Sequence, residues 1–283
     1  MEINIQNYIV AFVDVLGQRA QMEGLLFMPP KSDEKGRREF TERIRRSVQA
    51  IKFIQDNFLF HATFCNERHQ TDIQGVESDV AETIQRFRKA HITTQRFSDG
   101  LVLFCPLAEE GHFPLNSVSG IFRSCASMML CGLDQGFPFR AGIAIGAGYS
   151  TGEGDIYGPV VAEAYRLESE VAMYPRVVLS DSIVDWLLSF DKRSYSTDVE
   201  TRVTLALRDL CLDSVMKDND GVFAIDYLNP RMLESLGGSQ NVSEPIRGMK
   251  DFVDEMIKKY EDKPRILGKY VWVRNYIRSR IQE

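Results

Sequence analysis

The sequence predicts an α+β fold, and three observations support that prediction. Apolar runs rich in strand-forming residues alternate with longer segments whose apolar residues recur every three or four positions. The short turn Ser98-Asp99-Gly100 separates two of the apolar runs, as expected for a hairpin. The 283 residues contain neither repeats nor low-complexity tracts, and they are enough to bury a substantial core.

The elements expected in the first half of the chain follow the order β, α, β, β, α, β. They are a strand at 8–14, a loop at 29–36, a helix at 37–58, a loop at 67–74, a helix at 76–87, strands at 91–97 and 101–105, a helix at 118–133 and a strand at 137–149. This order is that of the split βαβ, or ferredoxin-like, arrangement, in which the first and third strands are central, adjacent and antiparallel. We therefore expect Asp14, at the end of the first strand, to lie beside Asp99, at the start of the third.

The second half of the chain adds elements to this core. We expect a helix at 158–171 with Pro159 near its first turn, a strand at 176–179, a helix at 182–190, a hairpin of strands at 210–215 and 222–227 across Asn219-Asp220-Gly221, and helices at 245–260 and 265–281. The sequence is therefore divided into a core domain, 1–228, and a helical C-terminal extension, 229–283, packed on it. Lys217 and Lys269 have no assigned role, and the aromatic residues Tyr270, Trp272 and Tyr276 are expected to pack.

Composition excludes several classes of protein. A formal charge of −6 argues against a nucleic-acid coat or an anionic-membrane binder. No stretch approaches the ~20 apolar residues of a membrane span, and the start of the chain lacks the pattern of a signal peptide. The five cysteines form no CxxC pair, which favours reduced thiols in a cytoplasmic protein, and the four histidines lack zinc-site spacing. Neither a G-x-S-x-G elbow nor a P-loop is present.

Two acidic residues stand where an apolar, strand-like run meets a turn. They are Asp14, in Phe12-Val13-Asp14-Val15-Leu16-Gly17, and Asp99, in Arg96-Phe97-Ser98-Asp99-Gly100. An Asp at the end of a buried strand is unfavourable unless a cap, a partner or a metal satisfies it. Each residue alone could be a helix cap or a turn former. Two carboxylates side by side would repel each other without a cation, so together they predict a hard-cation site.

Four motifs in this order resemble those of class III nucleotidyl cyclase catalytic domains. The family's first motif, an aromatic residue and an Asp with a Gly three residues beyond it, matches the Phe12–Gly17 segment. Its second metal-binding Asp, in a hairpin turn, matches Ser98-Asp99. The segment 139–146 is similar to the family's fourth strand. The later motif Asp-aliphatic-aromatic-Gly, followed by an Arg, matches Asp155-Ile156-Tyr157-Gly158 with Arg166.

The resemblance extends over about residues 7–228 and departs from the family at three positions. The family's transition-state Asn falls on Ala162, its adenine-recognising Lys on Gln95, and a phosphate-binding Arg on Ala147. The stretch 163–168 and the C-terminal helices are more similar to a bacterial branch that contains the pyrimidine cyclases of Pycsar anti-phage systems. The resemblance implies conversion of UTP, or as a second choice CTP, into 3′,5′-cyclic UMP or cyclic CMP plus pyrophosphate. A separate effector protein would detect the product.

The resemblance also implies a two-metal mechanism with two Mg²⁺ or Mn²⁺ ions in each site. Asp14 and Asp99 would bind both ions, and the Val15 carbonyl would complete one coordination shell. The turn through Leu16 and Gly17 is expected to expose backbone N–H groups at a helix start, where they can bind a triphosphate.

Three further residues are candidates for substrate contacts. Arg166 would contact the α-phosphate as charge builds in the transition state; the alternative is a surface ion pair with Glu163 or Glu170. Gln95 and Asp155 occupy the family's base-recognition positions, where an amide and a carboxylate can match the polar edge of uracil or cytosine. Arg140 is expected to form an ion pair within its strand region.

The family acts as a head-to-tail dimer, so the resemblance implies a homodimer with two interfacial active sites. Two alternatives stay open. A catalytically degenerate, cyclase-like nucleotide sensor is supported by Ala162 and Ala147, and an adenylate or guanylate cyclase would use the same metal site. A diguanylate cyclase or palm-type polymerase would need a Gly-Gly-Asp/Glu-Glu/Asp-Phe hairpin, which the Phe97–Leu101 segment does not supply.

Overall fold

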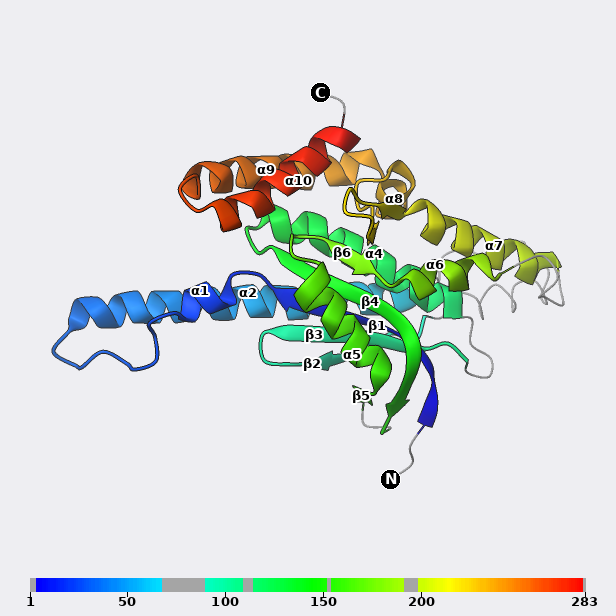
Figure 1. Ribbon diagram of the computed structural model, residues 1–283, viewed down its shortest axis with the longest axis horizontal. Coiled ribbons are helices and arrows are strands. Elements are labelled where there is room, and N and C mark those ends of the chain that lie inside the picture. The colour runs from blue at the N-terminus through cyan, green and yellow to red at the C-terminus, as the bar shows by residue number, and fades with distance from the viewer. Residues whose placement is uncertain (1–3, 68–89, 109–113, 152–153, 191–197, 282–283) are drawn as a thin grey trace.

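The computed structural model describes residues 4–67, 90–108, 114–151, 154–190 and 198–281 (Figure 1). Its strands are β1 (Asn4–Val15), β2 (Thr93–Arg96), β3 (Gly100–Pro106), β4 (Phe139–Ser150), β5 (Ile156–Tyr157), β6 (Val177–Leu179), β7 (Val215–Lys217) and β8 (Phe223–Ile225). Its helices are α1 (Gln18–Met22), α2 (Glu34–Glu67), α4 (Pro114–Asp134), α5 (Pro159–Arg166), the π-helical turn η2 (Leu167–Val171), α6 (Asp181–Leu188), α7 (Asp198–Asp213), α8 (Pro230–Ser235), α9 (Ser239–Lys259) and α10 (Pro264–Arg280).

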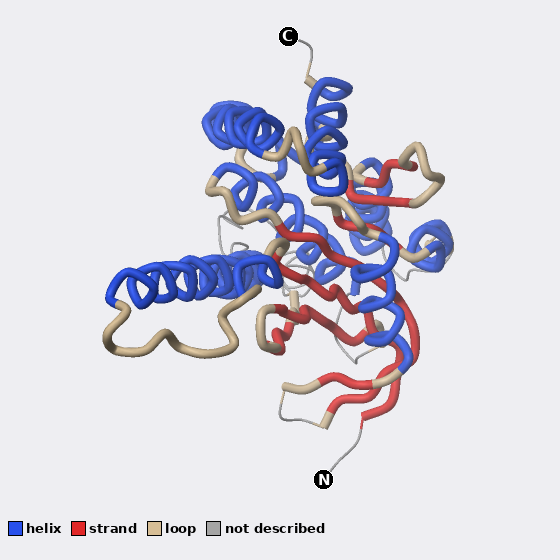
Figure 2. Tube along the Cα trace, turned by 60° about the vertical axis from the view of Figure 1, so that its left-hand side comes forward, coloured by secondary structure: helices blue, strands red, loops and turns tan. Residues whose placement is uncertain are grey.

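The strands form one eight-stranded sheet in the order β2-β3-β1-β4-β6-β8-β7, with β5 paired to β4. All of these pairs are antiparallel except β4 with β6. Figure 2 shows helices on both sides of the strands. The predicted α+β class is therefore confirmed, and so is the antiparallel pairing of the strand that contains Asp14 with the strand that follows Asp99.

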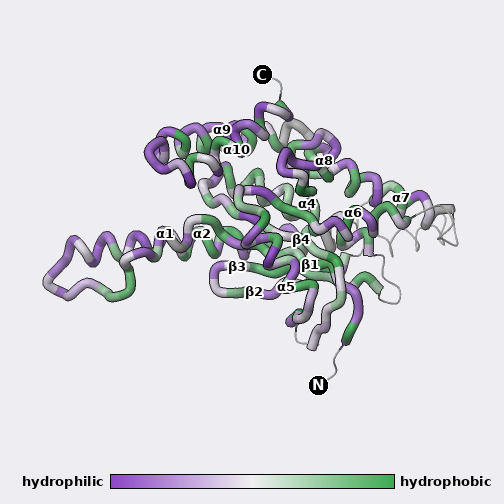
Figure 3. The backbone as a smooth tube through the Cα atoms, in the orientation of Figure 1, coloured by the Kyte–Doolittle hydropathy of each residue, from purple (hydrophilic) through white to green (hydrophobic). Residues whose placement is uncertain are grey.

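Alternate side chains of β1 enter two apolar cores on opposite faces of the sheet, as the two-residue period of a strand requires. Ile9 and Val13 belong to the larger core, which contains residues of α2 and α4. Tyr8 and Val10 belong to the smaller core, which contains residues of α5 and η2. Asp14 shares the alternation of Tyr8 and Val10 and so lies on the α5 face. Figure 3 shows the hydrophobic colouring concentrated in the central strands and α4, while much of the outer helix α9 is hydrophilic.

The C-terminal helices lie over α4 and contribute to the larger core (Figure 1). Tyr276 is buried, and its hydroxyl donates a hydrogen bond of 2.7 Å to Asp226, next to the end of β8. The Trp272 ring stacks between Tyr174 and Tyr276, with centroid distances of 5.5 and 5.6 Å. The predicted packing role of Trp272 and Tyr276 is confirmed. Among the described residues, no helix combines the length and hydropathy needed to cross a bilayer.

Two predicted elements differ from the structure. The segment 210–213, predicted as strand, is the end of α7, and the hairpin is the shorter pair β7 and β8. The reason is that Thr204, Leu207 and Cys211 recur at helical spacing against the core, which outweighs the strand-like run at 210–212. The predicted helix at 158–171 is continuous, but its second half is the π-helical turn η2. The predictions for 76–87 and nearly all of 67–74 lie outside the described residues.

Candidate active site

Asp14 lies between two strands at the end of the sheet. In the register of the sheet it is opposite Gly100 of β3 on one side and Arg140 of β4 on the other. Phe97 and Gly100 exchange backbone hydrogen bonds of 3.1 Å, so Ser98 and Asp99 form a two-residue hairpin turn. A Cβ atom on Gly100 would come within 2.9 Å of the Val13 carbonyl oxygen. The glycine is therefore needed for the close approach of the two backbones, which brings Asp99 next to Asp14.

A third carboxylate, Glu168, joins this pair from η2. Its side chain is only 2% exposed, and its Oε1 lies 2.5 Å from Nε of Arg140. Arg140 also places Nη2 3.6 Å from Asp14 Oδ2 and donates a hydrogen bond of 3.3 Å to the Ser169 carbonyl. Neither Arg140 Nε nor Glu168 Oε1 makes a well-aligned hydrogen bond within the described part of the chain. The charges of Arg140 and Glu168 are therefore close, but the two groups are poorly aligned for a hydrogen bond.

The electrostatic balance of this cluster favours additional positive charge. Burial raises the pKa of Asp14, and the charge of Asp99 raises it further, while Arg140 opposes both effects. Burial likewise raises the pKa of Glu168 to about 7, with a further contribution from Asp14. Asp14 and Glu168 thus share the positive charge of Arg140, and each has a pKa above its ordinary value.

The turn after β1 differs in part from its predicted role as a phosphate-binding turn. Gly17 has a φ of 89°, in the left-handed region that favours glycine, and is exposed. The Leu16 N–H, however, donates a 2.9 Å hydrogen bond to the Pro138 carbonyl, so this donor is not free for a phosphate. The Gln18 side chain is buried and accepts a hydrogen bond from Ser47 of α2. The turn is therefore held on the sheet and on α2, with Gly17 at its exposed point.

The two candidate base-recognition residues are brought together. Gln95 of β2 accepts, through Oε1, a 3.1 Å hydrogen bond from the backbone N–H of Ile156, the residue after Asp155. The Tyr157 hydroxyl donates to Asp155 Oδ2 at 3.4 Å. Because the Gln95 oxygen is engaged, its amide N–H₂ group is the part left to face a ligand. The pair thus offers donors from Gln95 and an acceptor from Asp155.

Arg166 forms a surface ion pair with Glu163, which was the alternative to its predicted contact with the α-phosphate. Its guanidinium donates two hydrogen bonds to Glu163, of 2.8 and 2.7 Å, on the exposed side of α5. Among the described residues, no hydrogen bond or ion pair joins Arg166 to Asp14 or Asp99. Within one protomer, therefore, the structure brings Asp14 and Asp99 together but does not connect Arg166 to them.

Exposed aromatic rings surround this part of the sheet. Phe12 stacks on Phe97 with a centroid distance of 5.8 Å and contacts the edge of Tyr165 at 5.2 Å. Phe97 and Tyr165 are 40% and 53% exposed. A second stacked pair, Tyr149 and Tyr157, lies where β4 meets β5. Exposed aromatic rings therefore lie near Gln95 and Arg166 in the chain, at Phe97 and Tyr165.

Sequence reasoning did not identify Glu168 or assign Lys269 of α10. Lys269 is half-buried; burial and the charge of Arg140 lower its pKa, while the charge of Asp14 raises it. A signal for Glu168 was present, since Val160, Ala164 and Glu168 recur every four residues and place an acid on the apolar face of the helix predicted at 158–171. The π-helical turn, which frequently marks functional sites, has no comparable sequence signal.

The residues present fit a hard divalent cation. The donors are carboxylate oxygens of Asp14 and Asp99 and the nearby Val15 carbonyl, which are ligands of the type that Mg²⁺ and Mn²⁺ prefer. The raised pKa of Asp14 and the imperfectly bonded Glu168 oxygen indicate unbalanced negative charge. Within the described ranges, no group of three or more His, Cys, Asp or Glu side chains is placed so that it could hold a metal ion by itself. The cluster would therefore need substrate oxygens to complete a coordination shell, as is usual for Mg²⁺ bound with phosphates.

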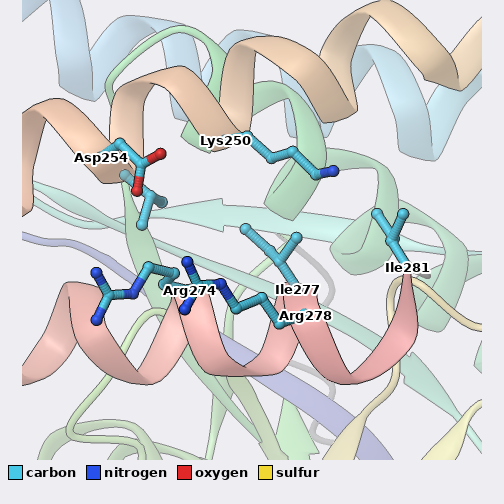
Figure 4. Close-up of a pocket in the computed structure, with 7 residues that line it drawn as sticks. Lys250, Asp254, Arg274, Ile277, Arg278 and Ile281 are labelled. Carbon is cyan, nitrogen blue, oxygen red and sulfur yellow. The ribbon is translucent and has the colours of Figure 1, made fainter. Parts of the chain in front are cut away.

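A separate hollow between α9 and α10 does not belong to this site (Figure 4). It is lined by Lys250, Val253, Asp254, Arg274, Ile277, Arg278 and Ile281 and has a volume of about 50 Å³. This volume is far below the several hundred Å³ of a nucleotide pocket. No candidate site residue lines it.

Comparisons with known proteins do not identify the chain: no protein-family model and no curated protein sequence matches it.

Proposed function

We propose that this protein is a pyrimidine nucleotide cyclase, which converts UTP, or as a second choice CTP, into the 3′,5′-cyclic monophosphate and pyrophosphate. The proposal rests above all on one observation: the β1–β3 register puts Asp14 opposite Gly100, with Asp99 adjacent in the hairpin turn. Paired carboxylates at such a position suit phosphoryl transfer, in which positioning and charge stabilisation dominate catalysis. The likeness of the four motifs to class III cyclases supports the same reaction.

The reaction forms one bond and breaks one bond at the α-phosphorus. The ribose 3′-oxygen attacks, its proton passes to solvent, and pyrophosphate leaves with the electron pair of the cleaved bond. Asp14 and Asp99 would hold two divalent ions, which lower the pKa of the 3′-hydroxyl and neutralise the phosphates. Arg140, which contacts Glu168 and the Ser169 carbonyl, would help to position Asp14 through its ion pair with that carboxylate. Because the Glu168 carboxylate occupies Nε of Arg140, the arginine does not neutralise Asp14 fully.

Recognition of the base would use the donor and acceptor on Gln95 and Asp155. Uracil offers an O4 acceptor and an N3–H donor, which match the Gln95 amide N–H₂ and the Asp155 carboxylate. The same pair can match the N3 acceptor and N4 amine of cytosine, which keeps CTP as the second choice. The hydrogen bond from the Ile156 N–H to Gln95 Oε1 holds the side-chain amide of Gln95 in one orientation.

The proposed active unit is a homodimer in the cytoplasm. In one protomer Arg166 is paired with Glu163 and is not connected to the Asp14 cluster, so it would act on a site of the second subunit. The exposed rings of Phe97 and Tyr165 beside these residues support burial of this face against another copy. Its product would act as an anti-phage signal that a separate effector detects.

Product analysis tests this proposal directly. The full-length protein is incubated with each of the four nucleoside triphosphates and Mn²⁺, and nucleotide products are identified by mass spectrometry. We expect a cyclic pyrimidine monophosphate, its loss in Asp14→Ala, and its retention in Asp56→Asn, which changes an exposed acid paired with Arg96. A cyclic purine product would support an adenylate or guanylate cyclase. Nucleotide binding without any turnover would overturn the proposal in favour of a nucleotide sensor.

A further inference from the structure

A hollow of about 840 Å³ opens between the turn that follows β1 and the C-terminal helices. On one side it is lined by Leu16 and Gly17, the residues that directly follow Asp14 and Val15. On the other side it is lined by residues of α9 and α10 and the loop between them, among them Lys259 and Lys269. The C-terminal helices therefore face the turn that follows Asp14 and Val15 across a space large enough for a phosphate chain.

The charge of this hollow favours an anion. Lys269 is half-buried, and no ion pair to it is formed by the described residues. Its pKa is lowered by burial and by Arg140 and raised by Asp14, so it lies within electrostatic reach of the carboxylate cluster. Lys259 also lines the hollow, whereas Glu23 is the acidic side chain on the lining. The half-buried ammonium of Lys269, which lines the same hollow as Leu16 and Gly17, is therefore a favourable place to bind a phosphate oxygen.

The aromatic side chains of the hollow favour the phosphate end of a ligand over its base. Tyr260 and Tyr270 stack on each other with an interplanar angle of 4°, and Phe252 contacts Tyr270 edge-on. Lys259 and Lys263 lie over the Tyr260 ring at 5.3 and 5.9 Å. These contacts occupy much of the ring surface that a base would need for stacking.

We propose that this hollow receives the polyphosphate end of the nucleoside triphosphate, with Lys269 of α10 contacting the leaving pyrophosphate. A substrate whose α-phosphate lies at Asp14 and Asp99 would extend its remaining phosphates past Gly17 toward Lys269. The C-terminal helices are then part of the active site, and the hollow is also the route by which pyrophosphate leaves. This inference rests on the proposed function for the identity of the substrate.

Binding of inorganic pyrophosphate and tripolyphosphate tests the inference without requiring turnover. We expect both probes, titrated calorimetrically with Mg²⁺ present, to bind Lys269→Gln at least tenfold more weakly than the wild type. Lys258→Gln, which changes an exposed lysine of α9 outside the hollow, should remain within twofold. The affinity of uridine monophosphate should not change in either variant. Lys259→Gln provides a second variant, with a smaller loss because that side chain is exposed.

The outcomes separate this inference from the proposed function. Equal affinity of pyrophosphate for the wild type and Lys269→Gln, or no binding to the wild type, would overturn the inference even if UTP is cyclised. Lys269-dependent binding of pyrophosphate in a protein that cyclises no nucleotide would overturn the proposed reaction and keep the hollow as a polyphosphate site.

Discussion

Two arginines, the buried Arg176 and the partly buried Arg140, differ in how they are paired with acidic side chains. The Arg176 side chain is 1% exposed and donates to Asp218, Asp220 and the carbonyls of Ala172 and Val171. Each of its three guanidinium nitrogens donates at least one hydrogen bond, and the bond to Asp220 helps to lower the pKa of that residue, against the effect of burial. This network has the properties of a structural ion pair.

The Arg140 cluster has the opposite properties. Its carboxylates Asp14 and Glu168 have raised pKa values, and the bond between Arg140 Nε and Glu168 is poorly aligned. The fully buried Arg176, with a side chain 1% exposed, thus balances its acidic partners, whereas Arg140, 20% exposed, leaves negative charge unbalanced at Asp14 and Glu168. Unbalanced, shifted groups are typical of functional sites. We therefore expect Arg176 to contribute mainly to stability, and the comparison is consistent with our proposal that the cluster at Asp14 binds a ligand.

The largest expected effect is the loss of activity in Asp14→Asn. Removal of a metal-binding charge should lower turnover of UTP at least a thousandfold, about 4 kcal/mol of transition-state stabilisation. The melting temperature should stay the same or rise, because one of three repelling carboxylates is gone. Steady-state kinetics measure the turnover of UTP and a thermal melt measures the melting temperature, with Asp56→Asn as the control. A fall in melting temperature with retained turnover would make Asp14 a structural residue and abolish the contrast.

The next largest effect is on the stability of Arg176→Gln. Truncation leaves Asp218 and Asp220 without their partner, and breaking a buried pair in this way typically costs about 3–5 kcal/mol. Urea denaturation of this variant should show that loss. Arg96→Gln, at the exposed pair with Asp56, should change stability by less than about 1 kcal/mol. Equal losses in the two variants would show that the Arg176 network does not stabilise the fold as described.

A smaller effect is the pH dependence of stability caused by Glu168. Its pKa is about 7 in the folded protein, above its ordinary value of 4.5, so the folded state binds the proton more tightly than the unfolded state. The free energy of unfolding should therefore decrease as pH rises from about 4.5 to about 7. Glu168→Gln should lack this decrease and exceed the wild type by about 1–3 kcal/mol at pH 8, but by much less at pH 5. Urea denaturation at pH 5 and pH 8 measures the free energy of unfolding of both proteins. If the difference between them were the same at the two pH values, this prediction would be wrong.

The central pairing was predictable from sequence because it depends on the order of the elements. An apolar run that ends in Asp14 and a hairpin at Ser98-Asp99 specify which strand ends meet, and the β1–β3 register agrees. The glycine at position 100 was part of the predicted turn, and the structure adds a reason for it, the close approach to the Val13 carbonyl oxygen.

What could not be predicted depends on tertiary contacts. The π-helical turn that buries Glu168 arises from packing on β4, where a continuous helix was expected. Lys269 is far from Asp14 in sequence and approaches it only through the packing of α10, which no local pattern encodes. The end of α7 was predicted as strand because the short apolar run at 210–212 resembles one.

Counting bound manganese ions tests the central claim most directly. Electron paramagnetic resonance of Mn²⁺ titrated into the protein with a non-hydrolysable UTP analogue measures how many ions are immobilised per site. The account predicts two ions in the wild type and in Asp56→Asn, and their loss in both Asp14→Asn and Asp99→Asn. Unchanged manganese binding in either of the last two variants would contradict it.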